Sequence, residues 1–168
     1  MLSGAKKHSQ VKLAFWHGVC LRTEKQDMKG KILLADDDAD VLAALSAALA
    51  SEGYEVIVAR NGREAIERFR EGHIDIALLD LNMPIKGGWE AFERLTTIHP
   101  LLQVIVITAR PDQYPLAAAA GVAALMEKPL DLPLLIRTIH ELLCEPVEGR
   151  LSRFICKRPS TRYLVSDS

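Results

Sequence analysis

Short apolar runs alternate with amphipathic helical patterns five times between residues 31 and 145, and this alternation limits the possible folds more than any other feature. The runs are apolar throughout, which is typical of strands buried on both faces. Repeats of strand and helix form right-handed βαβ units around a parallel sheet. The sequence therefore predicts an α/β fold with a doubly wound, five-stranded parallel sheet. The expected strands are residues 31–35, 54–59, 74–79, 103–108 and 122–126.

Charge divides the chain into three segments. Residues 1–29 carry a net charge of +4, residues 30–145 carry −8, and residues 146–168 carry +3. We expect an N-terminal extension over 1–29, a folded domain over 30–145 and a short basic C-terminal tail over 146–168. The tail is too short to bury a core of its own. The acidic middle segment argues against nucleic acid as the main partner of the folded domain.

Cysteine content and hydropathy indicate the compartment. Three widely spaced cysteines do not form a disulfide framework, and this favours a reducing environment. The longest nearly uninterrupted apolar stretch, residues 116–126, is 11 residues long. A membrane-spanning helix needs about 20. We therefore expect a cytoplasmic protein without a membrane span.

Polar residues with catalytic or metal-binding chemistry follow four of the five expected strands. Ligands of open parallel α/β sheets bind outside the C-terminal ends of the strands, so these residues should meet at one edge. They are Asp36, Asp37 and Asp38 after the first strand, Asp80 and Asn82 after the third, Thr108 at the end of the fourth, and Lys128 after the fifth.

This set of residues has the chemistry needed to accept a phosphoryl group. Neighbouring carboxylates such as Asp36, Asp37 and Asp80 repel one another unless a cation neutralises them. Oxygen ligands favour Mg²⁺, which commonly accompanies phosphate groups. Lys128 supplies a fixed positive charge, and the Thr108 hydroxyl can donate a hydrogen bond to an oxyanion. Phosphoryl transfer depends mostly on such positioning and charge neutralisation.

The motifs resemble the receiver domain of two-component response regulators, similar to the chemotaxis regulators, over about residues 31–145. They are I-L-L-A-D-D-D at 32–38, D-L-N-M-P at 80–84, Gly-Gly at 87–88, I-T-A at 107–109 and Lys-Pro at 128–129. The resemblance implies a flavodoxin-like (βα)5 receiver fold. It also implies that Asp80 is the phosphoacceptor and that the donor is the phosphohistidine of a sensor histidine kinase or histidine phosphotransfer protein.

The resemblance further implies a Mg²⁺ site. Asp37, Asp80 and the backbone carbonyl of Asn82 would bind the ion directly. Asp36 would act mainly through water.

The resemblance also assigns roles at the ends of the last two strands. Thr108 and Lys128 would bind the phosphoryl oxygens, and the Lys128–Pro129 peptide bond would be cis. The chain departs from the family at Leu125, where receivers often have a Tyr or Phe that works with the Thr. This departure questions the aromatic part of the switch but not phosphorylation.

Some of these residues have simpler interpretations. Asp38 is better explained as a helix cap than as a metal ligand. The last expected helix carries Leu134, Ile136 and Leu143 beyond its main apolar stripe. With the Ala-rich helix at 116–120, these side chains form either a partner or dimer face or part of a wide buried stripe.

The leading functional hypothesis is a phosphorylation-controlled switch that hydrolyses its own phosphate slowly and is not a turnover enzyme. Only 23 residues follow residue 145, so no output domain is expected. Output would pass to a protein partner or homodimer through the last two helices, without direct DNA binding.

Two alternatives remain open. A Mg²⁺-dependent phosphohydrolase with an aspartyl-phosphate intermediate would use Asp36-x-Asp38, although no insertion is long enough to form a substrate cap. A receiver-like scaffold would act without phosphorylation.

Overall fold

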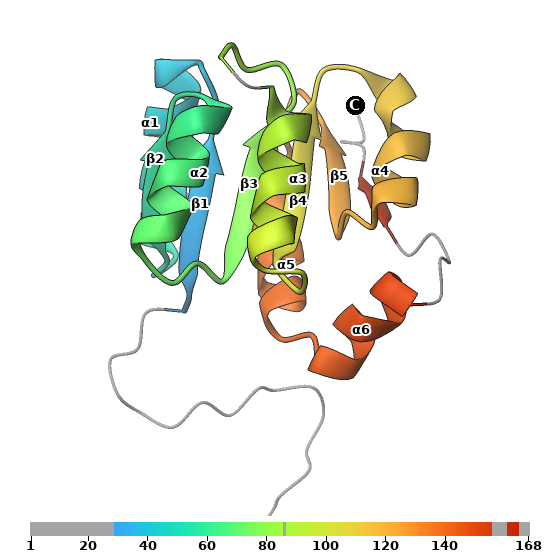
Figure 1. Cartoon of the computed structure of the whole chain (residues 1–168). Coiled ribbons are helices and arrows are strands. Elements are labelled where there is room, and N and C mark those ends of the chain that lie inside the picture. The colour runs from blue at the N-terminus through green and yellow to red at the C-terminus, as the bar shows by residue number, and fades with distance from the viewer. Residues whose placement is uncertain (1–28, 86, 156–160, 165–168) are drawn as a thin grey trace, which may run out of the picture.

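The computed structural model describes residues 29–85, 87–155 and 161–164. Within them lies one sheet of six parallel strands in the order β2-β1-β3-β4-β5-β6 (Figure 1). The strands are β1 Lys31–Ala35, β2 Glu55–Ala59, β3 Ile76–Asp80, β4 Gln103–Thr108, β5 Ala124–Glu127 and β6 Arg162–Leu164. The helices are α1 Ala39–Ser51, α2 Gly62–Glu71, α3 Gly88–Ile98, the 3₁₀ turn η1 Pro111–Gln113, α4 Tyr114–Ala120, α5 Leu132–Leu143 and α6 Val147–Ile155.

Helices cover both faces of the sheet and form two apolar cores (Figure 1). Phe69 of α2, Phe92 of α3 and Ala117 of α4 pack on one face. Leu45 of α1 and Ile139 of α5 pack on the other. Every residue of β3 and β4 is buried, because these central strands have helices on both sides. The doubly wound parallel α/β prediction is confirmed.

Polar side chains set the starts of several helices. The Asp38 carboxylate accepts hydrogen bonds from the Asp40 and Val41 amides at the start of α1. Asn61 caps α2 in the same way, and Asp131 caps α5. Such caps satisfy backbone N–H groups that have no partner in the first turn of a helix. The interpretation of Asp38 as a cap is confirmed.

The predicted number of strands is one too low. β6 comes from the expected C-terminal tail, and it pairs with the outer edge of β5. It has three residues, which are too few to produce a recognisable alternation of apolar and polar side chains. Its position depends on contacts with residues far away in the sequence, so the local pattern gives no signal for it.

The extra apolar residues of α5 are largely covered. Leu134, Ile136 and Leu143 are partly buried and pack against the same core as Leu135 and Ile139. This favours a wide buried stripe over a free partner face on α5. Leu116 of α4, in contrast, is 52% exposed.

No helix in the described ranges combines the length and the apolar character needed to cross a membrane. The expected extension over residues 1–29 lies outside the described part of the chain apart from Lys29.

Candidate functional site

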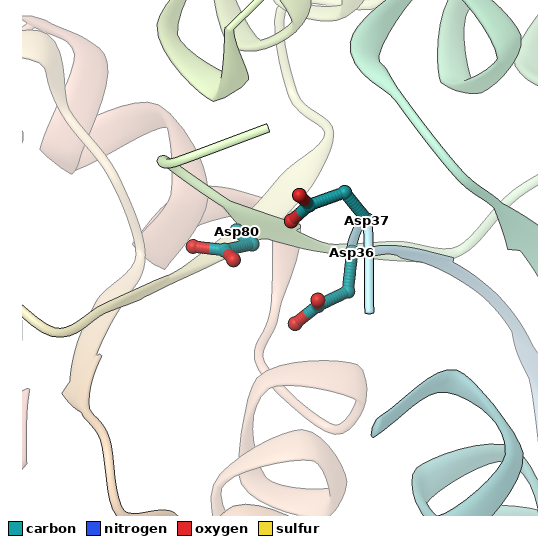
Figure 2. Close-up of side chains that lie close together, drawn as sticks. All are labelled: Asp36, Asp37 and Asp80. Carbon is teal, nitrogen blue, oxygen red and sulfur yellow. The ribbon is translucent and has the colours of Figure 1, made fainter. Parts of the chain in front are cut away.

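Three carboxylates meet where β1 and β3 end, and we call Asp36, Asp37 and Asp80 the acidic edge (Figure 2). Ala35 pairs with Leu79 across the two parallel strands, so the next residue of each strand reaches the same edge. Carboxylate oxygens of the three residues lie within 4.8 Å of one another. The convergence predicted from the strand ends is therefore present.

Two of the three carboxylates are buried. Asp36 is 1% exposed and Asp80 is 3% exposed, whereas Asp37 is exposed. One oxygen of Asp36 accepts the Asp38 amide at 2.9 Å, and one oxygen of Asp80 accepts the Asn82 amide at 3.1 Å. Burying a carboxylate is costly unless it is hydrogen-bonded and paired. These two backbone amides meet part of that requirement.

Lys128 supplies the opposite charge that the two buried carboxylates also require. Its Nζ lies 2.9 Å from Asp36 Oδ2 and 2.9 Å from Asp80 Oδ2, so one ammonium group bridges both buried carboxylates. Burial alone would lower the pKa of Lys128. The hydrogen bonds and charges of Asp80 and Asp36 outweigh burial, and the pKa is raised above its ordinary value. Lys128 is therefore a permanent positive charge at the acidic edge.

The backbone at the end of β5 aims Lys128 at the acidic edge. The Lys128 amide donates to the Thr108 carbonyl at 2.9 Å, which ties the end of β5 to the end of β4. The Lys128–Pro129 peptide bond is cis, as the resemblance implies.

Thr108 reaches the same end of the sheet but makes a different contact. It is fully buried, and its hydroxyl oxygen accepts the Arg110 amide at 3.0 Å. Arg110 directly precedes η1, so Thr108 connects the end of β4 to the turn that leads into α4. Leu125 is fully buried in the core on the α4 side of the sheet.

Gly88 lies beside the site, and the sequence indicates it only as part of the Gly-Gly motif at 87–88. A Cβ atom at this position would lie 2.2 Å from the Asp80 carbonyl oxygen and 2.8 Å from Leu81 Cα. Both are backbone atoms, so they cannot move aside as a flexible side chain could. Glycine thus lets α3 begin directly against the loop that carries Asp80. The Gly-Gly pair was the available signal, because close backbone approach is one reason for glycine.

One contact of the helix that follows the Asp80 loop could not be predicted from the sequence. Trp89 Nε1 donates to Gln113 Oε1 at 3.1 Å, so the start of α3 is joined to η1. The two residues are 24 positions apart, and no local pattern pairs them.

The donor set fits a Mg²⁺ ion. Three carboxylates and one ammonium group leave two negative charges, which a divalent cation would balance. Oxygen ligands are those that Mg²⁺ prefers. Within the described ranges, the acidic edge is the one group of three or more His, Cys, Asp or Glu side chains that lie close enough together to hold a metal ion.

Comparisons with known proteins agree with this geometry. The model of the response regulator receiver domain family matches residues 32–140. Response regulator RR06 of Streptococcus pneumoniae is 35% identical over 114 residues, which cover 67% of this chain and 52% of that protein. Transcriptional regulatory protein GlrR of Escherichia coli is 34% identical over 115 residues, covering 67% of this chain and 26% of that protein.

Solved structures share the fold. A CheY-like receiver domain protein of Methanospirillum hungatei has a TM-score of 0.65 at 27% identity, covering 73% of this chain and 97% of that one. Response regulator TrrA of Thermotoga maritima, solved with Mg²⁺ and beryllofluoride, has a TM-score of 0.63 at 28% identity, covering 67% of this chain and 98% of that one.

The chain spans about half or less of the length of these curated relatives. Several curated relatives are named transcriptional regulatory proteins, and this conflicts with the expectation of no direct DNA binding. The matched segment contains all three residues of the acidic edge and Lys128. Family match, fold and site geometry agree, and the chain belongs to the response regulator receiver domain family.

Proposed function

We propose that this chain is a phosphorylation-controlled signalling switch in which Asp80 accepts a phosphoryl group from a phosphohistidine. The observation that carries the proposal is the shared contact of Lys128 with Asp36 and Asp80, both at 2.9 Å. A buried carboxylate beside a fixed positive charge and a second acid can act as a phosphoryl acceptor whose added charge is neutralised in place. Residues 30–145 form the receiver domain in this proposal.

Transfer to Asp80 follows from ordinary phosphoryl chemistry. A carboxylate oxygen of Asp80 forms a bond to phosphorus while the P–N bond of the donor imidazole breaks. The product is an acyl phosphate, and later attack by water returns the carboxylate and inorganic phosphate. Lys128 holds its ammonium group 2.9 Å from the accepting side chain, where it would meet the new phosphoryl oxygens.

Asp37, Asp80 and the Asn82 carbonyl would hold the Mg²⁺ ion, with Asp36 acting mainly through water. When bound, the ion offsets negative charge on the phosphoryl group and its acceptor. Asp37 is the exposed member of the acidic edge, and its exposure suits direct binding of an incoming ion. The ammonium group of Lys128 contacts Asp36 and Asp80 instead.

Thr108 would donate its hydroxyl proton to a phosphoryl oxygen. Its oxygen already accepts the Arg110 amide, and a hydroxyl can accept one hydrogen bond while it donates another. This arrangement would connect phosphorylation to η1 and α4. The downstream partner would read the change there, since Leu116 of α4 is exposed.

A phosphohydrolase that uses Asp36-x-Asp38 is less well supported. Asp38 Oδ1 accepts the Asp40 and Val41 amides at 2.9 and 3.3 Å, so this carboxylate caps α1. An acid held as a cap is poorly placed to serve as the second catalytic carboxylate. Self-hydrolysis by a switch would instead be slow and limited to its own phosphate.

The proposal is tested by incubation with Mg²⁺ and acetyl phosphate, followed by intact-mass measurement. We expect one phosphoryl group on the wild type and on the control Asp38→Asn, and none on Asp80→Asn or without Mg²⁺. Sustained phosphate release by Asp80→Asn would favour the phosphohydrolase. A wild type that takes up no phosphoryl group would favour the scaffold.

A further inference from the structure

One side chain of the C-terminal strand β6, Tyr163, reaches the end of β5 that precedes Lys128. In the parallel pairing of β6 with β5, Tyr163 lies opposite Leu125. Facing residues of paired strands project from the same side of a sheet, so Tyr163 lies on the α4 side. The Tyr163 hydroxyl donates to Glu127 Oε1 near the end of β5.

The ring of Tyr163 makes a second contact. It packs against Tyr114, the first residue of α4, with ring centroids 5.0 Å apart and an angle of 47° between the planes. Aromatic pairs at this separation attract one another. One side chain of β6 thus joins the end of β5 to the start of α4.

Both ends of this link lie close in the sequence to Lys128 or Thr108, the two residues expected to bind the phosphoryl oxygens. Glu127 directly precedes Lys128, and it pairs in register with Thr108. Tyr114 follows η1, and η1 follows Arg110, whose amide donates to the Thr108 hydroxyl. Tyr163 therefore contacts the backbone segments that carry both residues expected to bind the phosphoryl oxygens.

A phosphoryl group on Asp80 would disturb this arrangement. Lys128 Nζ contacts Asp36 Oδ2 and Asp80 Oδ2 together, so it must leave at least one of these contacts to bind the new phosphoryl oxygens. Such a shift is resisted at the preceding residue, where Tyr163 holds Glu127.

We infer that Tyr163 is a positioning residue that holds the end of β5 and the start of α4 in the arrangement where Lys128 bridges Asp36 and Asp80, so that docking of Tyr163 opposes phosphoryl loading of Asp80. The inference rests on the proposed function. Coupling between two sites is reciprocal, so loading must loosen β6 by the same factor by which β6 weakens loading.

The other contacts of β6 provide a matched control. Arg162 pairs with Glu141 of α5 on the opposite face of the sheet from Tyr163. Thr161 donates its hydroxyl proton to the Val122 carbonyl at 2.6 Å, at the end of β5 away from Lys128. Removing the Arg162 pair leaves the contacts of Tyr163 with Glu127 and Tyr114 in place, and an exposed pair of this kind contributes little to the docking of β6.

The test is a calorimetric titration of the full chain with beryllofluoride in Mg²⁺. We expect Tyr163→Ala to bind about fivefold more tightly than wild type. Tyr163→Phe keeps the ring but loses the bond to Glu127, and it should show a smaller gain. Arg162→Gln should stay within about twofold of wild type.

Hydrogen exchange supplies a second readout. The Arg162 amide donates to the Ala123 carbonyl at 3.2 Å, so its exchange rate reports β6 docking. In wild type this rate should rise by about fivefold when beryllofluoride is bound. A role confined to stability would leave both the affinity and this response unchanged.

The outcomes separate the two proposals. A wild type that does not bind beryllofluoride in Mg²⁺ overturns the proposed function, and this inference with it. Binding with equal affinity in wild type and Tyr163→Ala, or an equal gain in Arg162→Gln, overturns the assignment of Tyr163 alone.

Discussion

β3 and β6 belong to the same sheet, but different interactions hold them in place. All five residues of β3 are buried, and its chain of apolar side chains contacts both cores before it ends at Asp80. β6 has three residues, all at least partly exposed. Polar side chains of Arg162, Tyr163 and the preceding Thr161 add to its backbone pairing with β5. Apolar burial contributes far more per residue than exposed polar pairs do.

The difference shows how one sheet can serve two purposes. The central strands are stable enough to hold buried charge at Asp36 and Asp80 in a fixed position. The role inferred for Tyr163 requires the edge strand to be attached weakly enough for a change at the site to alter its docking.

The largest expected effect comes from removing an apolar side chain in the centre. Leu78 of β3 is fully buried, and Leu78→Ala should lower the free energy of unfolding by about 3 kcal/mol. Leu164→Ala in β6 removes the same group from a partly buried position and should cost less than about 1 kcal/mol. Urea unfolding measures both. Similar losses would show that β6 is as firmly held as β3.

The next effect comes from the close approach of α3 to the end of β3. The added Cβ of Gly88→Ala would meet the Asp80 carbonyl at 2.2 Å, so we expect a loss of about 2 kcal/mol and displacement of the Asp80 loop. Gly87→Ala is the control, because its Cβ would lie 3.7 Å from the nearest backbone atom. Thermal unfolding and acetyl phosphate labelling should be near normal for the control. Equal behaviour of the two variants would contradict the close approach.

Removing the positive charge beside the acidic edge should destabilise the protein more than removing a positive charge on the outer strand β6. Lys128→Met leaves Asp36 and Asp80 buried without their shared partner and should cost about 2 kcal/mol in Mg²⁺-free buffer. Added Mg²⁺ should restore part of this loss, because a ligand that binds the folded state stabilises it. Arg162→Met removes an exposed pair with Glu141 and should cost less than about 1 kcal/mol. Mg²⁺ should leave this loss relative to wild type unchanged, because the variant keeps the acidic edge intact. A loss relative to wild type that Mg²⁺ reduces in both variants would contradict the role of Lys128.

The smallest effect concerns alkaline pH. The pKa of Lys128 is raised in the folded protein, where the hydrogen bonds of Asp80 and Asp36 outweigh burial. The stability linked to this group is therefore fully present below its unfolded pKa of about 10.4, and it is lost as pH rises through the folded pKa.

Comparison of wild type with Lys128→Met isolates the pH-dependent stability that comes from Lys128. Ionisation of Tyr54 also lowers the stability of the folded protein as pH rises, because burial and the Glu52 charge raise its pKa. Both proteins contain Tyr54, so its effect cancels in the comparison. Urea unfolding from about pH 9 to pH 11 should show a steeper fall in wild type. Parallel slopes would mean that Lys128 is not held by the two carboxylates.

The sequence was informative where its signal is local. Buried apolar runs predicted the five main strands, and the rule for strand ends placed Asp36, Asp80 and Lys128 at one edge. Thr108 reaches that edge, although its hydroxyl contacts Arg110. The requirement at Gly88 depends on how closely a helix approaches a loop, and no pattern in the sequence measures that distance.

β6 could not be predicted from the sequence, for a different reason. Its attachment joins Tyr163 to Glu127 across 36 positions and Thr161 to Val122 across 39. Each contact is specific, but together they leave no periodic pattern in a segment of three residues. Pairing of this kind becomes visible only when the rest of the sheet is in place.

The central claim is that the buried carboxylate at the end of β3 accepts the phosphoryl group. Borohydride reduces an acyl phosphate and marks the residue that carried it, so peptide mapping after treatment with acetyl phosphate and Mg²⁺ locates the acceptor. We predict reduction at Asp80 alone, and none when Mg²⁺ is removed. Reduction at Asp36, which lies beside Asp80 and shares Lys128, would contradict the account, as would the absence of any reduced residue.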